Sequence, residues 1–198
     1  AASDVYKRQD IGGGSFEFST GTNALPDAAM SVPLGAGRLT REFFDEQPPS
    51  PKQVKRLRKY VREQIAPVAE NLLRYGAPDM TVGTSKTFRS LARICGAAPY
   101  SAGPHVKREM HLQDLRLWTR RMEAMTVSER SDLPGVSKAR AEQMLAGAIA
   151  AEAAMEAFGI ETMRVCPWAL REGLILKRIE HLAEGTGTPV NPKTLLGA

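Results

Sequence analysis

The chain has 198 residues, of which 42% are hydrophobic and 25% are charged, and its formal net charge is +5. This composition is typical of an ordinary globular protein, and the length suffices for one domain with one sizeable core. The positive charge favours an anionic partner over a cationic one. No apolar run approaches the roughly 20 residues that cross a bilayer, and the N-terminus lacks the apolar core of a secretion signal, so we expect a soluble protein.

The first predicted elements are two short strands. Residues 15–20 alternate phenylalanine with polar residues, which is the period-two pattern of a half-buried strand. Turn-forming residues at 21–23 separate this strand from a second one at 28–34. The domain therefore opens with an antiparallel meander.

Helices dominate the next part of the chain. Residues 39–44 predict a short helix, and a proline-rich connection then leads into a long helix. The apolar residues of the long helix recur every three or four positions, at Val54, Leu57, Val61, Ile65, Val68 and Leu72. Pro67 inside this pattern predicts a kink or a break, and Gly76 is the natural end of the helix.

Strands and helices then alternate. Residues 79–83 predict a strand, residues 84–87 a turn of the size that holds a phosphate, and residues 88–95 a helix. An exposed loop at 97–107 and an amphipathic helix at 111–125 follow.

The C-terminal part continues this alternation. Ser137 is the predicted N-cap of a buried helix that extends to Met155, and residues 161–166 predict a strand. A last helix at 170–182 precedes a polar tail. This order of elements predicts an α/β fold, with a mixed sheet of opening antiparallel strands followed by alternating helices and strands.

The residues before Asp10 do not fit this pattern. A strand that leads to a buried phosphate loop should be mostly Val, Ile, Leu or Ala, whereas residues 5–9 read VYKRQ. Their charges argue against a native central strand, so we expect residues 1–9 to be a non-native or truncation segment and the native chain to have contributed a further lobe upstream. The domain is then assigned to residues 10–184 and the polar tail to residues 185–198.

Three successive glycines follow Asp10 and Ile11 and form the most informative motif of the chain. At Gly12, Gly13 and Gly14 the backbone can bring its N–H groups against an anion without a side chain in the way, and Ser15 adds a hydroxyl donor. Asp10 and Glu17 flank the turn, from where their carboxylates could reach a hydrated Mg²⁺. The alternative interpretation is a flexible linker of GGGS type. The alternating strand directly after the motif favours an ordered hairpin.

The run DIGGGSFEF resembles the second phosphate motif of the exopolyphosphatase/guanosine pentaphosphate (pppGpp) phosphatase family, a branch of the actin-like/Hsp70/sugar-kinase superfamily with a ribonuclease-H-like fold. Further blocks resemble this family in the expected order, at residues 32–40, 83–92, 133–141 and 169–173. Together the blocks span nearly all the chain, which makes the resemblance far more specific than a lone glycine triplet.

The resemblance implies a cytoplasmic, Mg²⁺-dependent exopolyphosphatase that releases terminal phosphate from inorganic polyphosphate held between two lobes. This chain would be the second, C-terminal lobe, inactive alone, with the catalytic base in the missing N-terminal lobe. Asp10 and Glu17 would hold the metal directly or through water. The implied phosphate contacts are Gly12, Gly13, Gly14 and Ser15, with a second set at Gly83, Thr84, Ser85, Lys86 and Thr87. Two alternatives stay open: pppGpp phosphohydrolysis in the same fold, and a non-catalytic polyphosphate-binding lobe.

Lys86 departs from the family, which more often has glycine at that position. A lysine could neutralise a phosphate chain or block the contact that glycine permits. The missing lobe is an expected partner, and an apolar former lobe interface would also predict self-association as a homo-oligomer.

Other segments favour simpler interpretations. The basic residues of the long helix, among them Arg58 and Arg62, are expected on a solvated face rather than on a nucleic-acid surface. Residues 133–136 resemble the hairpin of DNA-binding helix-hairpin-helix modules, but a turn followed by an N-cap is the simpler interpretation. Cys95 and Cys166 form no CxxC pair and are expected in the core of a protein from a reducing compartment. The three histidines lack ligand spacing, so we do not expect a zinc site, and Trp118 and Trp168 are expected in the core or at the lobe interface.

Overall fold

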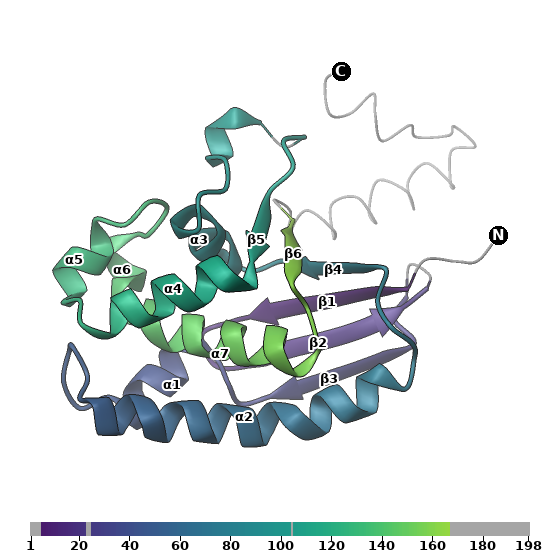
Figure 1. Ribbon diagram of the computed structural model, residues 1–198, viewed down its shortest axis with the longest axis horizontal. Coiled ribbons are helices and arrows are strands. Elements are labelled where there is room, and N and C mark those ends of the chain that lie inside the picture. Colours follow the sequence, from purple (N-terminus) through teal and green to yellow (C-terminus); the bar gives the residue numbers. More distant parts are fainter. Residues whose placement is uncertain (1–4, 23–24, 104, 167–198) are drawn as a thin grey trace, which may run out of the picture. The chain divides into compact units, whose positions relative to one another are not determined.

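A computed structural model describes residues 5–22, 25–103 and 105–166. In this part of the chain six strands form one mixed sheet in the order β3-β2-β1-β4-β6-β5 (Figure 1). The strands are β1 (Tyr6–Ile11), β2 (Phe16–Gly21), β3 (Ala28–Val32), β4 (Met80–Gly83), β5 (Glu109–His111) and β6 (Thr162–Val165). The helices are α1 (Ala36–Phe43), α2 (Pro51–Leu73), α3 (Lys86–Ile94), α4 (Leu112–Glu123), α5 (Val127–Ser131), α6 (Lys138–Ala141) and α7 (Met144–Ala157), with a short 3₁₀ turn, η1 (Tyr100–Ala102).

The topology confirms the predicted mixed α/β sheet. Strands β1, β2 and β3 form the antiparallel meander, and β4 and β6 continue the sheet parallel to β1. Strand β5, which the sequence analysis did not predict, adds an antiparallel edge next to β6. Because β1, β4 and β6 are parallel, their carboxyl ends lie at the same edge of the sheet, where open α/β sheets bind ligands.

Strand β1 corrects one expectation, because residues 6–9 do form a central strand, paired with β2 on one side and β4 on the other. The backbone hydrogen bonds of β1 to β2 and β4 do not depend on side-chain type. Successive side chains of β1 point to opposite faces of the sheet, and the polar residues are accommodated differently on each face. Arg8 is exposed on one face, and on the buried face the Lys7 ammonium donates to the carbonyl of Gly76 at 3.2 Å. Gln9 is also buried, but its side-chain amide has no hydrogen-bond partner among the described residues.

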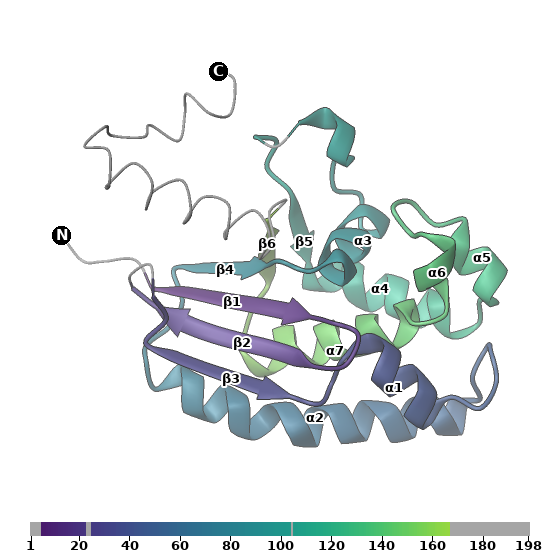
Figure 2. The same ribbon diagram turned by 180° about the vertical axis from the view of Figure 1, so that it is seen from behind.

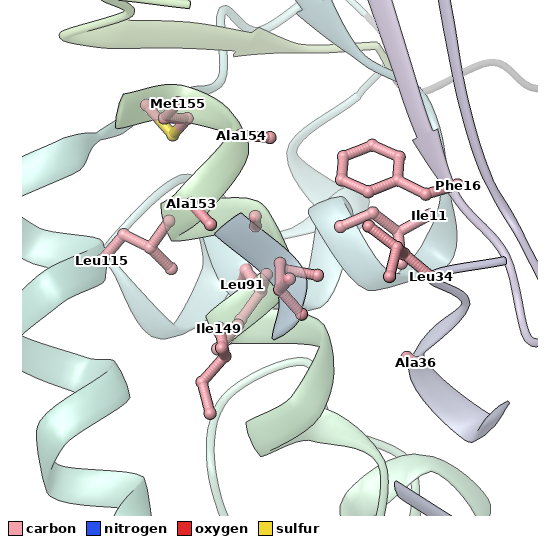
Figure 3. Close-up of a cluster of buried hydrophobic side chains, with 14 of the residues drawn as sticks. Ile11, Phe16, Leu34, Ala36, Leu91, Leu115, Ile149, Ala153, Ala154 and Met155 are labelled. Carbon is pink, nitrogen blue, oxygen red and sulfur yellow. The ribbon is translucent and has the colours of Figure 1, made fainter. Parts of the chain in front are cut away.

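The core lies between the sheet and the helical layer that contains α7. Figure 2, seen from behind, shows β1 and β2 in front of α7. The rings of Phe16 and Phe18 stack with centroids 4.1 Å apart, and the ring of Phe158 stacks on Phe18 at 5.6 Å. Figure 3 shows Ile11, Phe16 and Leu34 close to the start of α1, so the core extends beneath the glycine motif. All three of these side chains are fully buried.

Helix α2 continues through Pro67 without the break that the sequence analysis considered. A proline removes one backbone hydrogen bond, but buried residues on both sides of it, such as Ile65 and Val68, hold the helix against the core. The helix begins with a capping box in which Ser50 accepts from the backbone N–H of Gln53. No helix among the described residues is long and apolar enough to span a bilayer.

The single helix predicted from Ser137 to Met155 is wrong in one respect, because it divides into α6 and α7. Ser137 occupies the N-cap position of α6, although its side chain makes no capping hydrogen bond. Helix α5 was not predicted, since five residues are too few for a periodic signal. The helix predicted at 170–182, Trp168 and the polar tail at 185–198 lie outside the described residues.

Candidate functional site

The glycine loop, defined as Gly12 to Ser15, connects β1 and β2 and forms an ordered hairpin turn rather than a linker. The N–H of Gly12 donates to the carbonyl of Ser15 at 2.9 Å, directly after the last cross-strand pair. Gly13 and Gly14 are exposed, and a Cβ atom at either position would meet no other described residue within 4 Å. Neither has a positive φ. Neither backbone conformation nor packing therefore requires glycine at these two positions, and the space above them is open to a ligand.

The N-terminus of α1 is hydrogen-bonded to the glycine loop. The N–H of Ala36 donates to the carbonyl of Gly12 at 3.0 Å, and the N–H of Arg38 donates to the carbonyl of Gly13 at 2.9 Å. Gly35 permits this approach, because a Cβ atom there would overlap the backbone of Gly14 and Ser15. In the sequence Gly35 is simply one residue of the block at 32–40 that resembles the family. Its role is not visible without the loop beside it.

The hydrogen bonds leave several donors of the loop available. Among the described residues, no backbone bond uses the N–H groups of Gly13, Gly14 or Ser15, whereas the carbonyls of Gly12, Gly13 and Ser15 are all engaged. Successive free N–H groups in a tight turn form a concave site for an anion. Within the described residues the loop therefore has three N–H donors outside the backbone hydrogen bonds, and their contact with a phosphate stays a prediction.

Asp10 and Glu17 are direct cross-strand partners in the β1–β2 pair, so their side chains are on the same face of the sheet. One oxygen of Asp10, Oδ2, accepts from the Thr84 hydroxyl at 2.7 Å and pairs with Arg8 at 3.3 Å. One oxygen of Glu17, Oε1, accepts from the hydroxyls of Ser15 and Ser31. Within the described residues these contacts leave the second oxygen of each carboxylate without a partner.

This donor set fits Mg²⁺, which proteins commonly bind through one or two carboxylates together with waters and substrate phosphates. No cluster of three or more His, Cys, Asp or Glu residues that could hold a metal occurs in the described part of the chain. A divalent ion at Asp10 and Glu17 would therefore complete its shell with water and phosphate oxygens.

The second predicted phosphate segment, Gly83 to Thr87, lies beside the first. Thr84 donates its backbone N–H to the carbonyl of Gln9 at 3.0 Å, and the Thr87 hydroxyl donates to the carbonyl of Ile11 at 3.1 Å. The N-terminus of α3 is thereby fixed against the end of β1.

Most residues of this segment have structural roles in packing or helix capping. Gly83 is required by packing, since a Cβ atom there would lie 2.7 Å from the ring of Phe88. The Ser85 hydroxyl caps α3 by accepting from the N–H of Phe88 at 3.2 Å. Lys86 is the exposed residue of the segment. A second anion contact stays a prediction, and it depends mainly on Lys86 and on the helix N-terminus.

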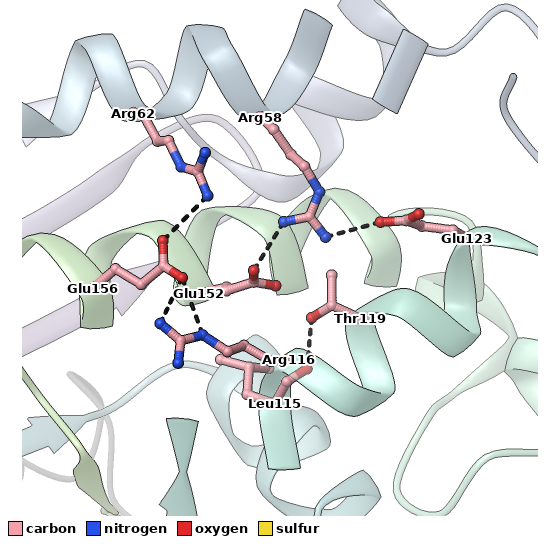
Figure 4. Close-up of polar contacts among 8 residues, drawn as sticks. All are labelled: Arg58, Arg62, Leu115, Arg116, Thr119, Glu123, Glu152 and Glu156. Carbon is pink, nitrogen blue, oxygen red and sulfur yellow. Dashed lines mark hydrogen bonds and ion pairs between the residues drawn. The ribbon is translucent and has the colours of Figure 1, made fainter. Parts of the chain in front are cut away.

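The basic residues of α2 have a role that the sequence analysis missed. Arg58 pairs with Glu123 of α4 at 2.8 Å and with Glu152 of α7 at 2.9 Å, and Arg62 and Arg116 share Glu156 (Figure 4). Burial alone would lower the pKa of Arg58, but its bonds to the two glutamates outweigh burial and raise it.

These ion pairs line an open cavity of about 570 Å³ between α2, α4 and α7. Arg58 and Arg62 therefore connect α2 to α4 and α7 through ion pairs and are not simply solvated. The exposed Lys52, Lys55 and Lys59 do match the predicted solvated face.

Cys95 and Trp118 are partly buried and pack against the core. Cys95 and Cys166 are free and half-buried rather than fully buried. Burial raises the pKa of the Cys95 thiol to about 12, so the thiol stays protonated and unreactive. Trp118 packs against the core, with the guanidinium of Arg121 4.8 Å from its ring centre.

Comparison with known proteins agrees with the architecture of sheet and loop. Residues 8–182 match the Ppx/GppA phosphatase family, and the chain belongs to that family. Proteins named exopolyphosphatase 1 from Mycobacterium leprae and Mycobacterium tuberculosis are 50% identical over 177 residues, which is 89% of this chain and 52% of each relative. The chain therefore spans about half the length of these relatives.

Solved structures show the same fold. The Ppx/GppA family member of Aquifex aeolicus superimposes with a TM-score of 0.78 at 26% identity, covering 89% of this chain and 56% of that one. An exopolyphosphatase of Cytophaga hutchinsonii gives the same TM-score at 21% identity, covering 91% of this chain and 58% of that one. The predicted mixed α/β fold of the actin-like ATPase type is confirmed.

Proposed function

We propose that this chain is the second phosphate-gripping lobe of an exopolyphosphatase that releases terminal phosphate from inorganic polyphosphate with Mg²⁺. The observation that carries the proposal is the glycine loop, whose free N–H groups lie between the cross-strand carboxylates Asp10 and Glu17. The name of the 50% identical relatives supports polyphosphate as the substrate. The free, half-buried cysteines support a reducing, cytoplasmic setting.

Each part of the site has a defined task in this proposal. The N–H groups of Gly13, Gly14 and Ser15 bind the oxygens of the terminal phosphoryl group and stabilise negative charge that develops on them. Asp10 and Glu17 hold Mg²⁺, which when bound neutralises phosphate charge. Thr84 and Ser31 orient these carboxylates through their hydroxyl groups. We assign no catalytic base to the described residues and place it in the first lobe, so the chain alone should bind without turnover.

Calorimetric titration of the 198-residue chain with inorganic polyphosphate, with and without MgCl₂, tests the proposal. We expect binding that requires Mg²⁺ and that weakens at least about tenfold in Asp10→Asn and Glu17→Gln, which each remove one charged ligand. Glu161→Gln is the matched control, since Glu161 is an exposed acid outside the site and its loss should not alter binding. Equal affinity in Asp10→Asn, Glu17→Gln and the parent, or no binding by the parent, would sink the proposal.

Gly14→Ala separates binding from folding. Its methyl group meets no atom within 4 Å in the described part of the chain, so stability should change by less than about 0.5 kcal/mol. The same methyl group occupies the space above the loop, so we expect weaker polyphosphate binding. Unchanged affinity in this variant would place the phosphate elsewhere.

Addition of the first half of a full-length relative distinguishes an enzyme lobe from a binding lobe. Recovered phosphate release supports the exopolyphosphatase proposal, whereas binding without release supports a non-catalytic polyphosphate-binding lobe. The same mixture tests pppGpp, and faster release from pppGpp than from polyphosphate would favour that substrate.

A further inference from the structure

Gly147 is an unusual residue for its place in the fold. It lies in the first turn of α7, a helix built largely of alanine, and it is buried. Glycine destabilises a helix interior relative to alanine, and Gly147 does not have the positive φ that would require it. The reason for glycine must therefore lie in what packs against it.

Two other helices converge on Gly147. A Cβ atom at this position would lie 2.7 Å from Cγ2 of Thr87 and 3.3 Å from Cβ of Ala36. Thr87 is in the first turn of α3, and Ala36 is the first residue of α1. The N-termini of α1 and α3 thus meet over a position that has no side chain.

Both neighbours of Gly147 form hydrogen bonds to the backbone where β1 ends and the glycine loop begins. The Thr87 hydroxyl donates to the carbonyl of Ile11 at 3.1 Å, and the Ala36 N–H donates to the carbonyl of Gly12 at 3.0 Å. These two carbonyls are consecutive along the chain. Two adjacent carbonyls at the end of β1 and the start of the loop are therefore held by residues that both pack against Gly147.

We propose that Gly147 is a positioning residue for the phosphate grip, acting through Thr87 and Ala36 on the glycine loop. This inference rests on the proposed function of that loop. A methyl group at position 147 would collide with Cγ2 of the buried Thr87, and two responses at Thr87 would relieve the contact. Rotation of Thr87 about χ1 moves its hydroxyl away from Ile11, and displacement of α3 moves the whole contact. Either response shifts the N–H groups that bind phosphate.

The test is Gly147→Ala in the 198-residue chain, with amide NMR shifts of residues 12–15 and polyphosphate affinity in MgCl₂ as the two measurements. We expect the loop shifts to move in the absence of ligand and the affinity to fall about tenfold, as expected for the loss of one good hydrogen bond. If Gly147 had a purely structural role, Gly147→Ala would lower the unfolding temperature but would leave the loop shifts and the affinity of the folded protein unchanged.

The second substitution Thr87→Ser makes the test specific. Serine keeps the hydroxyl that donates to Ile11 but lacks the Cγ2 atom that a Cβ at 147 would strike. Thr87→Ser is the reference for the double variant, and we expect Gly147→Ala/Thr87→Ser to match its loop shifts and to bind within about twofold of its affinity. If Gly147→Ala alone does not fold, the double variant must still fold and bind.

Three outcomes decide the inference. Parent-like shifts and affinity in Gly147→Ala would overturn it, as would a defect that Thr87→Ser does not restore. If the shifts move and are restored while the parent chain binds no polyphosphate, Gly147 positions the loop and the proposed function fails.

Discussion

The Gln9 side chain gives a direct test of how a polar residue is tolerated in the central strand. Gln9 is 1% exposed, it faces the core from the middle of β1, and both of its side-chain amide atoms lack a hydrogen-bond partner within the described residues. A buried amide without partners destabilises a protein by about 1–3 kcal/mol. Leucine has a similar volume and no polar atoms, so Gln9→Leu should raise the free energy of unfolding by about 2 kcal/mol.

Urea denaturation followed by circular dichroism measures this change, with linear extrapolation to zero denaturant. For a chain of this length, about 2 kcal/mol corresponds to a rise in Tm of about 4–8 °C. The matched control is Gln113→Leu, the same chemical change at an exposed position of α4, where we expect less than about 0.5 kcal/mol. A Gln9→Leu protein no more stable than the parent, at an unchanged urea dependence, would refute the argument and show that the amide is satisfied by water.

Two further predictions concern charges elsewhere in the fold. Arg58→Met should destabilise the protein by about 2–3 kcal/mol in the same assay, because it leaves the buried Glu152 carboxylate unpaired, whereas Lys59→Met removes an exposed 3.8 Å pair with Glu63 and should cost less than about 0.5 kcal/mol. Equal effects of Arg58→Met and Lys59→Met would mean that the ion pairs of Arg58 with α4 and α7 do not contribute specifically to stability. Stability should also fall as the pH rises from 9 towards 12, because folded Cys95 keeps a proton, with a pKa raised to about 12, that the unfolded chain releases near 9.0. This part of the loss is about 1.4 kcal/mol between pH 8 and pH 10 and should be missing in Cys95→Ala; an identical pH profile in that variant would contradict it.

Local patterns predicted the elements whose signals are periodic. The alternation around Phe16 and Phe18 gave β2 its correct face, and the stripe from Val54 to Leu72 gave the buried side of α2. Local patterns failed where packing decides. The polar residues before Asp10 contradicted a strand that two neighbouring strands nevertheless form, and Pro67 did not break a helix anchored on both sides. In each case tertiary contacts outweighed the local preference.

The candidate site likewise has a part that the sequence predicted and a part that only the tertiary structure decided. The sequence alone placed Asp10 and Glu17 on either side of the glycine turn, and the observed register of β1 and β2 makes them cross-strand partners on one face of the sheet. Only the tertiary structure decided that Thr84 and Thr87 reach the end of β1, across 74 and 76 residues of chain. A parallel neighbour arrives through a long crossover that leaves no local signal of its register. The role of Gly147 was hidden for the same reason, since a missing side chain has meaning only once the helices that occupy its space are in place.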